Sequence, residues 1–232
     1  MFCIGVDFAS QPNKTALCAI EWTGVEARVQ DCRLNVSDAD VEANAEGADK
    51  VGIDVPFGWP QTFVAAVTAY HQRQAWPSAT RLALRYRRTD LYVHNATSRW
   101  PLSVSSDRIA CTAFRAAALL SRMEQRHGPI DRTGSGKFVE VYPRAARDRW
   151  GITSPGALAA ATKNRLILPD ALAARCRQSE HCFDALVAAL AARAAAIGYC
   201  DSVPECDLEA ATVEGWIALP QRESLARLWS AR

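Results

Sequence analysis

Four acidic residues stand in segments where a protein core would not select them. Asp7 ends the apolar run FCIGV, Asp54 ends VGI just before a proline, Glu140 lies inside KFVEVYP, and Asp184 lies inside CFDALVAALAARA. Burying a lone carboxylate costs on the order of several kcal/mol unless it is paired or binds a metal ion. We therefore take the four residues together as one candidate site, both catalytic and metal-binding. For any one of them alone, a strand-end cap or an ion pair with arginine is the alternative.

The chemistry of such a site follows from its donor atoms. Several carboxylates held close together cannot all stay ionised without a cation. Ligation by oxygen alone favours Mg²⁺ or Mn²⁺ over zinc. Two such ions, about 3.5–4 Å apart, stabilise the attacking and leaving oxygens when a phosphodiester is displaced. The four acids therefore predict a site for two Mg²⁺ or Mn²⁺ ions.

The segments around the acids predict the elements that would position them. Short β-rich runs at 2–8, 15–22 and 26–34 are separated by turn sequences, which is typical of three antiparallel strands. A helix at 37–48, with Ser37 as its N-cap, then leads to a buried strand at 51–55. A helix that crosses between two strands implies parallel pairing of the fourth strand with the first.

The rest of the chain completes an α/β pattern. Residues 60–135 are basic and helical, with the clearest helical periodicity at 106–126. A fifth strand is expected at 138–142 and a strongly apolar helix at 180–197. We therefore predict a single domain over residues 1–232 with a five-stranded mixed sheet, three strands antiparallel and then two parallel, flanked by helices. The helical basic insertion lies between strands four and five, and this element order is that of the ribonuclease H-like fold.

The predicted elements bring three of the acids to one edge of the sheet. The carboxyl ends of strands one and four place Asp7 and Asp54 side by side, where ligands bind in open α/β sheets. Asp184 falls at the edge of the apolar stripe of the last helix. Its neighbours Ala188 and Ala191 are small, so the helix can approach the sheet closely.

The distribution of charge points to a partner rich in phosphate. Residues 60–150 carry 15 basic and 6 acidic side chains, whereas residues 1–59 carry 4 basic and 10 acidic ones. Such a segment is expected to bind DNA or RNA; the alternative is a solvated basic surface without a partner.

The candidate substrate-binding residues lie in or near the basic segment. In the sequence RRTD, Arg87 and Arg88 are expected to hold a phosphate and Asp90 to orient one of them, unless the group is a surface ion pair. Lys14 and Ser10, in the first turn, are weaker candidates for contacts with the substrate.

The N-terminus and the cysteines bear on the cellular compartment. The chain opens with an apparent strand and without the features of a signal peptide, and its longest uncharged apolar run, 185–192, is too short to span a bilayer. No C-x-x-C pair occurs among the eight cysteines, which are interpreted as free thiols. These features predict a cytoplasmic protein without a membrane partner.

Five segments together carry a resemblance to a known family: GVDFAS, GIDVPFGWP, RRTD, VEVYP and HCFDALVAALAARA. Over residues 2–198 the chain resembles the predicted nucleases catalogued as domain of unknown function 429, in the ribonuclease H-like superfamily. In the resolvase-like branch of that superfamily, acids on the first strand, the fourth strand and the last helix hold two metal ions. The resemblance assigns these places to Asp7, Asp54 and Asp184, and the acid of the VEVYP-type motif to Glu140.

Two positions depart from the resolvase pattern. The fourth-strand acid, Asp54, is one methylene shorter than the glutamate of that branch. His181 stands where that branch has a second acid, three residues before Asp184. It is interpreted as a metal ligand, a proton shuttle or a solvated histidine at the start of the helix.

The sequence as a whole predicts a metal-dependent phosphodiester hydrolase, a nuclease, that acts on nucleic acid. One alternative is a non-catalytic module that binds nucleic acid or protein on the same scaffold. A second is an actin-like phosphotransferase, although the chain has one half of that architecture and lacks its glycine-rich phosphate turns.

Overall fold

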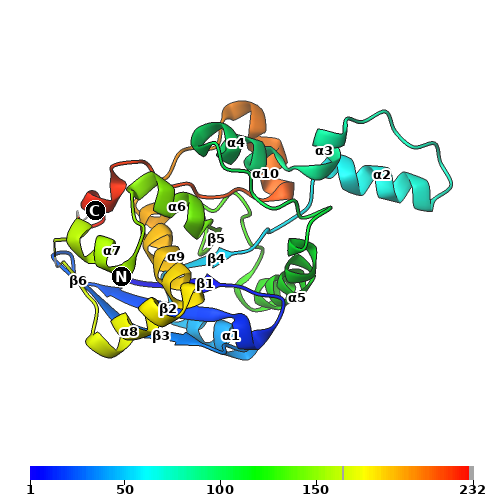
Figure 1. The fold of residues 1–232 in the computed structure, drawn as a ribbon. Helices are drawn as coiled ribbons and strands as arrows, with labels where there is room; N and C mark the ends of the chain where they lie inside the picture. Colours follow the sequence, from blue (N-terminus) through cyan, green and yellow to red (C-terminus); the bar gives the residue numbers. More distant parts are fainter. Residues whose placement is uncertain (164, 230–232) are drawn as a thin grey trace.

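The computed structural model describes residues 1–163 and 165–229 and is built on a six-stranded sheet with helices on both faces (Figure 1). The strands are β1 (Phe2–Asp7), β2 (Ala16–Trp22), β3 (Ala27–Leu34), β4 (Lys50–Asp54), β5 (Phe138–Glu140) and β6 (Leu166–Ile167). They lie side by side in the order β5-β4-β1-β2-β3-β6. Strands β1, β2 and β3 are antiparallel, β4 runs parallel to β1, and β5 runs parallel to β4.

The predicted α/β class is confirmed, but the predicted number of strands is wrong by one. The additional strand, β6, pairs in parallel with β3 through Ala27 and Arg28, at the edge of the sheet farthest from β5. A strand of two residues has no periodicity to recognise, because its conformation is set by the neighbouring edge rather than by its own sequence.

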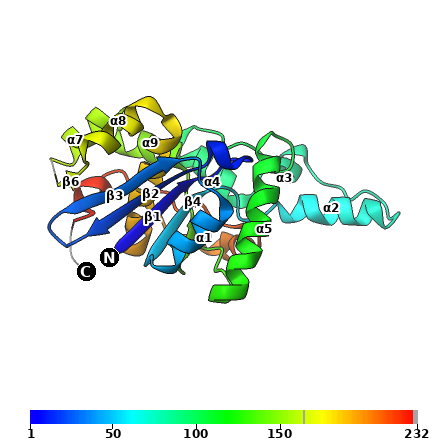
Figure 2. The ribbon, with the colours of Figure 1, turned by 90° about the horizontal axis from the view of Figure 1, so that it is seen from below.

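Ten α-helices occur in the described part of the chain. They are α1 (Asp38–Glu46), α2 (Gln61–His71), α3 (Arg81–Arg85), α4 (Arg88–Thr97), α5 (Ile109–His127), α6 (Pro143–Trp150), α7 (Pro155–Ala161), α8 (Asp170–Gln178), α9 (Glu180–Ala196) and α10 (Leu208–Glu214). Helices α1 and α5 cover one face of the sheet, and α7, α8 and α9 cover the other (Figure 2). Ser37 caps α1 as predicted, since its hydroxyl oxygen accepts a hydrogen bond from Asp40 N–H at 3.2 Å.

The alternation of side chains along β1 distributes its residues between the two cores. Ile4 and Val6 belong to the core beneath α1 and α5, whereas Cys3 belongs to the core beneath α9. Gly5 faces α9 at the closest point, where a Cβ atom would lie 2.1 Å from Ala189 N and 2.2 Å from Ala185 O. The backbone of α9 therefore contacts β1 directly. Only glycine at position 5 permits this contact, because any other residue has a Cβ atom.

Helices α2 to α5 all lie in the segment between β4 and β5, where the sequence predicts a helical insertion at 60–135. Of these, α5 packs on the sheet, while α2 and α3 project away from it as an arm (Figure 1). Within the described residues, every helix is too short or too polar to cross a membrane.

Candidate active site at the carboxyl edge of the sheet

Strands β1 and β4 bring two of the predicted acids together. In the parallel register of these strands Asp7 pairs with Asp54, so both side chains leave the same face of the sheet. Gly5 and Gly52 precede them on that face, beneath α9. The predicted juxtaposition of the two carboxyl ends is therefore present in the structure.

Helix α9 adds Asp184 to the pair. The first turn of α9 lies at the carboxyl edge of β1, because His181 Nδ1 contacts Asp7 Oδ2 there at 2.6 Å. Asp184 follows one turn later, and its carboxylate accepts a hydrogen bond from Arg147 Nη1 of α6 at 3.0 Å. The carboxylate of Asp54 forms no hydrogen bond or ion pair with any described residue.

The pKa values of all three aspartates are raised, mainly by burial. Burial is the main cause for Asp54, and the charges of Asp7, Asp184 and Glu140 raise its pKa further, well above the ordinary value. Burial also raises the pKa of Asp184 to about 6, although Arg147 opposes the shift. Burial raises the pKa of Asp7 against the opposing hydrogen bond from His181. Such a cluster has an unfavourable concentration of negative charge that a cation would relieve.

His181 contacts the cluster from the side of the solvent. The ring is 47% exposed, and its hydrogen bond to Asp7 raises the pKa of the imidazole above the ordinary value. The histidine therefore lies between solvent and the three aspartates, which is where a group that exchanges protons with water would have to stand.

Glu140 does not join the other three acids. In the register of β4 and β5 it pairs with Ile53, whose side chain packs in the core beneath α1 and α5. Glu140 therefore leaves the face of the sheet opposite to Asp7 and Asp54, and Val141 occupies the position beside Asp54. The expectation of one cluster of four carboxylates thus differs from the structure, because a single step along a strand changes the face.

Glu140 instead forms a buried ion network with two of the predicted substrate residues. Arg87 donates to Glu140 through Nη1 at 2.8 Å and through Nη2 at 2.7 Å, and to Asp90 Oδ1 through Nη2 at 2.9 Å. All three side chains are almost entirely buried. Burial alone would lower the pKa of Arg87, but Asp90 and Glu140 raise it above the ordinary value. Arg87 and Asp90 are therefore enclosed, and a substrate phosphate has no direct access to them.

The other predicted substrate residues lie at the surface. Arg88 is exposed and donates from Nε to Asp207 Oδ1 at 2.6 Å. Lys14 and Ser10 are exposed in the segment between β1 and β2, which follows Asp7 directly. These three residues are accessible to a ligand, in contrast to Arg87 and Asp90.

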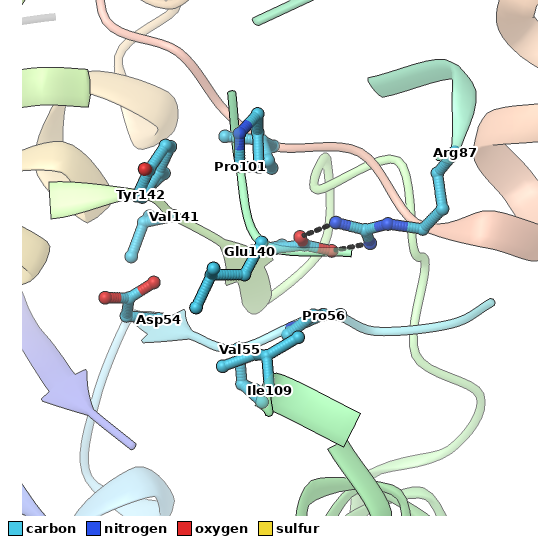
Figure 3. Close-up of a pocket in the computed structure, with 11 residues that line it drawn as sticks. Asp54, Val55, Pro56, Arg87, Pro101, Ile109, Glu140, Val141 and Tyr142 are labelled. Carbon is cyan, nitrogen blue, oxygen red and sulfur yellow. Dashed lines mark hydrogen bonds and ion pairs between the residues drawn. The ribbon is translucent and has the colours of Figure 1, made fainter. Parts of the chain in front are cut away.

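A pocket opens beside Asp54, with a cavity volume of about 170 Å³ (Figure 3). The carboxylate of Asp54 lies at one end, and the Glu140–Arg87 pair lies at the other, turned away from Asp54. Between them the wall is mostly apolar and is formed by Val55, Pro56, Pro101, Leu102, Ile109, Val141, Tyr142 and Ile217. Burial, followed by the charge of Asp54, raises the pKa of Tyr142 to about 12.

Comparison with protein families identifies the family of the chain. The sequence model of a family described as "Protein of unknown function (DUF429)" matches residues 5–209. The chain belongs to this family. The match to DUF429 begins on β1 and ends on α10, so it includes the three aspartates, His181 and Arg147. No curated protein and no solved structure matches the chain.

Sequence reasoning missed two residues that form hydrogen bonds at or near the site, Arg147 and Glu214. Arg147 has no local signal, because its contact with Asp184 joins α6 to α9 across 37 positions. Its Nε atom is buried and forms no hydrogen bond with the described residues. The carboxylate of Glu214, the last residue of α10, accepts hydrogen bonds from the backbone N–H of Gln61 at 2.8 Å and of Arg88 at 2.7 Å.

Proposed function

We propose that the protein is a metal-dependent phosphodiester hydrolase of the ribonuclease H-like superfamily that acts on nucleic acid in the cytoplasm. The observation that carries the proposal is the convergence of Asp7, Asp54 and Asp184 at the carboxyl edge of the sheet, with their pKa values raised. The order and pairing of β1 to β5 support the superfamily. The free state of all eight cysteines, five of them buried, supports a reducing compartment.

The donor chemistry of the cluster fits Mg²⁺ or Mn²⁺. Three carboxylates supply oxygen ligands only, and one of them, Asp54, lacks any partner in the described structure. The described residues hold no group of three or more His, Cys, Asp or Glu side chains already arranged to ligate a metal. Ligation therefore requires Asp7 to leave His181 and Asp184 to leave Arg147, since these contacts orient their carboxylates at present.

The residues of the chain have separate roles in the proposed reaction. Bound Mg²⁺ or Mn²⁺ would supply a nucleophilic water and neutralise charge on the phosphate. Asp7, Asp54 and Asp184 would hold the ions. Glu140 would not ligate them, because it pairs with Arg87 at the far end of the pocket. His181 would exchange protons between the site and solvent, because its ring is exposed and already shares a hydrogen bond with Asp7.

Arg147 replaces Arg87 as the expected phosphate ligand. Its guanidinium lies beside Asp184, and its buried Nε has a free donor. An arginine released from a carboxylate can bind a phosphate oxygen in the same planar geometry. Arg88 and Lys14, which are exposed, remain candidates for contacts farther along the nucleic acid.

A cleavage assay tests the proposed function. Labelled single-stranded and double-stranded DNA and RNA are incubated with the protein and Mg²⁺ or Mn²⁺, and products are resolved on a denaturing gel. We expect cleavage that EDTA abolishes and that Asp54→Asn reduces by about 100-fold or more, the usual scale for losing a catalytic electrostatic contact. Arg147→Met should lower cleavage without weakening Mn²⁺ binding, because Asp184 no longer has to leave an arginine before it ligates the ion. Cleavage that survives in Asp54→Asn would refute the assignment of the site.

A specific observation also favours a second function, a binding module without catalysis. Glu140 is paired with Arg87 and Asp184 with Arg147, which is the arrangement of structural ion pairs rather than of an open metal site. In this case oligonucleotides would bind without divalent cations, and none of the labelled substrates would be cleaved. If wild type and Asp54→Asn bind oligonucleotides with equal affinity and neither cleaves them, the protein is a binding module.

A further inference from the structure

Helices α2 and α3, with the segment between them, form an arm over residues 61–86 that projects from the body of the protein (Figure 1). Both ends of the arm begin at the pocket beside the candidate site. At one end, α2 begins seven residues after Asp54; at the other, Arg87 immediately follows the arm and lines the same pocket. The chain segments that enter and leave the arm therefore both border this pocket.

Buried polar contacts fix the base of the arm. The carboxylate of Glu214 accepts from the backbone N–H of Gln61 with one oxygen and of Arg88 with the other, at the first turns of α2 and α4. The network of Arg87 with Glu140 and Asp90 lies between them. These residues are thus enclosed because they attach the arm, which explains the burial of side chains that the sequence suggested for substrate.

The surface of the arm combines exposed aromatic rings with positive charge. Tyr70 is 70% and Trp76 is 51% exposed, and their ring centroids lie 6.1 Å apart. Arg73 and Arg81 are exposed nearby, and Arg73 lines a groove with Tyr70. Val64 and Val67 on α2 add exposed apolar surface.

The arm itself carries no acidic residue, although Arg85 at its base pairs with Asp107 outside the arm at 3.4 Å. The sequence contains no Asp or Glu between Asp54 and Asp90, and Asp90 is fully buried. An arm without acids repels cationic partners and attracts polyanions. Exposed rings among arginines are also the arrangement on which unpaired bases stack, since every base has a π-face.

We propose that the arm binds single-stranded nucleic acid, with Tyr70 and Trp76 stacking on bases and Arg73 and Arg81 contacting the phosphates. This inference rests on the proposed function and deepens it, because it names the single strand as the form of nucleic acid that the protein holds. Charge complementarity favours a polyanion over a second copy of the chain as the occupant.

Binding in the absence of metal tests the proposal separately from catalysis. The affinity of the full chain for a 5′-labelled single strand of about 20 nucleotides, enough for one or two binding sites, is measured by fluorescence anisotropy in EDTA. We expect the double variant Tyr70→Ala/Trp76→Ala to weaken binding by about tenfold or more. Arg73→Gln/Arg81→Gln should reduce the slope of log affinity against log salt by about 1.4.

Matched variants on the opposite side of the sheet serve as controls. Val25→Ala and Arg28→Gln change an exposed apolar and an exposed basic residue near the β2–β3 turn and should leave affinity unchanged. Asp54→Asn should also keep its affinity for the single strand, whatever its effect on cleavage. Wild-type protein that binds the single strand through the arm but cleaves none of the substrates would therefore refute only the proposed hydrolase.

Three outcomes would overturn the proposal for the arm. The first is the absence of single-strand binding by wild type at low salt, and the second is unchanged affinity in both arm variants. The third is a wild-type dimer in sedimentation that becomes a monomer in Tyr70→Ala/Trp76→Ala with oligonucleotide affinity unaltered. That result would assign the exposed rings to a contact between copies of the chain.

Discussion

Asp54 is the residue on which the candidate site depends most. Its neighbours Asp7 and Asp184 each contact a cationic side chain, whereas its own carboxylate contacts none in the described structure. Since nearby negative charges raise its pKa in addition to burial, ionised Asp54 is unfavourable in the folded protein without a cation. The proposed role of Asp54 as a metal ligand would relieve this unfavourable charge.

Replacing Asp54 should therefore stabilise the metal-free protein at high pH. The pKa of Asp54 is raised on folding, so the folded state holds a proton that the unfolded state has lost above about pH 4, and stability falls as pH rises. Below that pH the carboxyl is protonated in both states, and Asp54→Asn should change nothing. At about pH 8 in EDTA we expect the melting temperature to rise by about 2–4 °C, the effect of ~1 kcal/mol. Thermal unfolding at both pH values checks this, and equal stability at both would contradict it.

Glu140 should prove to be a structural residue. Glu140→Gln leaves Arg87 with one carboxylate instead of two in a buried network, and breaking such pairs costs about 3–5 kcal/mol. Glu46→Gln removes an exposed acid that lies 3.8 Å from Arg126 and should cost less than about 1 kcal/mol. Urea unfolding of both variants checks the difference. If Glu140→Gln unfolds like wild type but loses Mn²⁺ affinity, the residue is a ligand, as the sequence predicts.

At the scale of elements, the site depends on the close approach of α9 to β1 and β4. A Cβ atom at Gly5 would collide with the backbone of α9, and one at Gly52 would lie 2.8 Å from Ala188 O. The alanines of α9 and the two glycines are therefore complementary, and together they hold Asp184 over the ends of the strands. The helix is nearly continuous in apolar residues because it is buried on most sides.

Gly5→Ala should separate α9 from the sheet. Because the colliding atoms belong to the helix backbone, side-chain rotation cannot relieve the overlap, and we expect a loss of about 3 kcal/mol or more, at or beyond the usual range for overpacking. Gly47→Ala is the matched control, since a Cβ atom there meets nothing within 4 Å. Urea unfolding or the yield of soluble protein distinguishes the two variants. Equal stability would refute the packing described for α9.

Most of the elements could be predicted from the sequence because their signals are local. The apolar run of β1, the alternation along β3, the Ser37 cap and the apolar length of α9 each depend on residues close in the chain. The face of Glu140 could not be predicted, because it depends on the pairing of β5 with a strand more than 80 positions away. Arg87 and Asp90 suggested a phosphate site because RRTD shows charge but not burial.

At the scale of the whole molecule, positive and negative charges are concentrated in different places. Net positive charge lies in the middle of the chain, on and around the projecting arm, while three aspartates gather at the edge of the sheet. Many other arginines pair with acids within the body, as Arg115 and Arg122 do with Asp38 of α1. The molecule thus offers an anionic site for a cation beside a cationic arm for a polyanion, which is the combination that a metal-dependent nuclease requires.

The central claim is that the three aspartates bind a divalent cation, and calorimetric titration with Mn²⁺ tests it most directly. Wild type and Asp54→Asn are titrated at about pH 7.5, above the pKa of about 6 of Asp184, so that this carboxylate is ionised. The account predicts saturable binding by wild type, with release of protons, and its loss in Asp54→Asn. Folded wild-type protein that binds no Mn²⁺, or an Asp54→Asn variant that binds it equally well, would contradict the account.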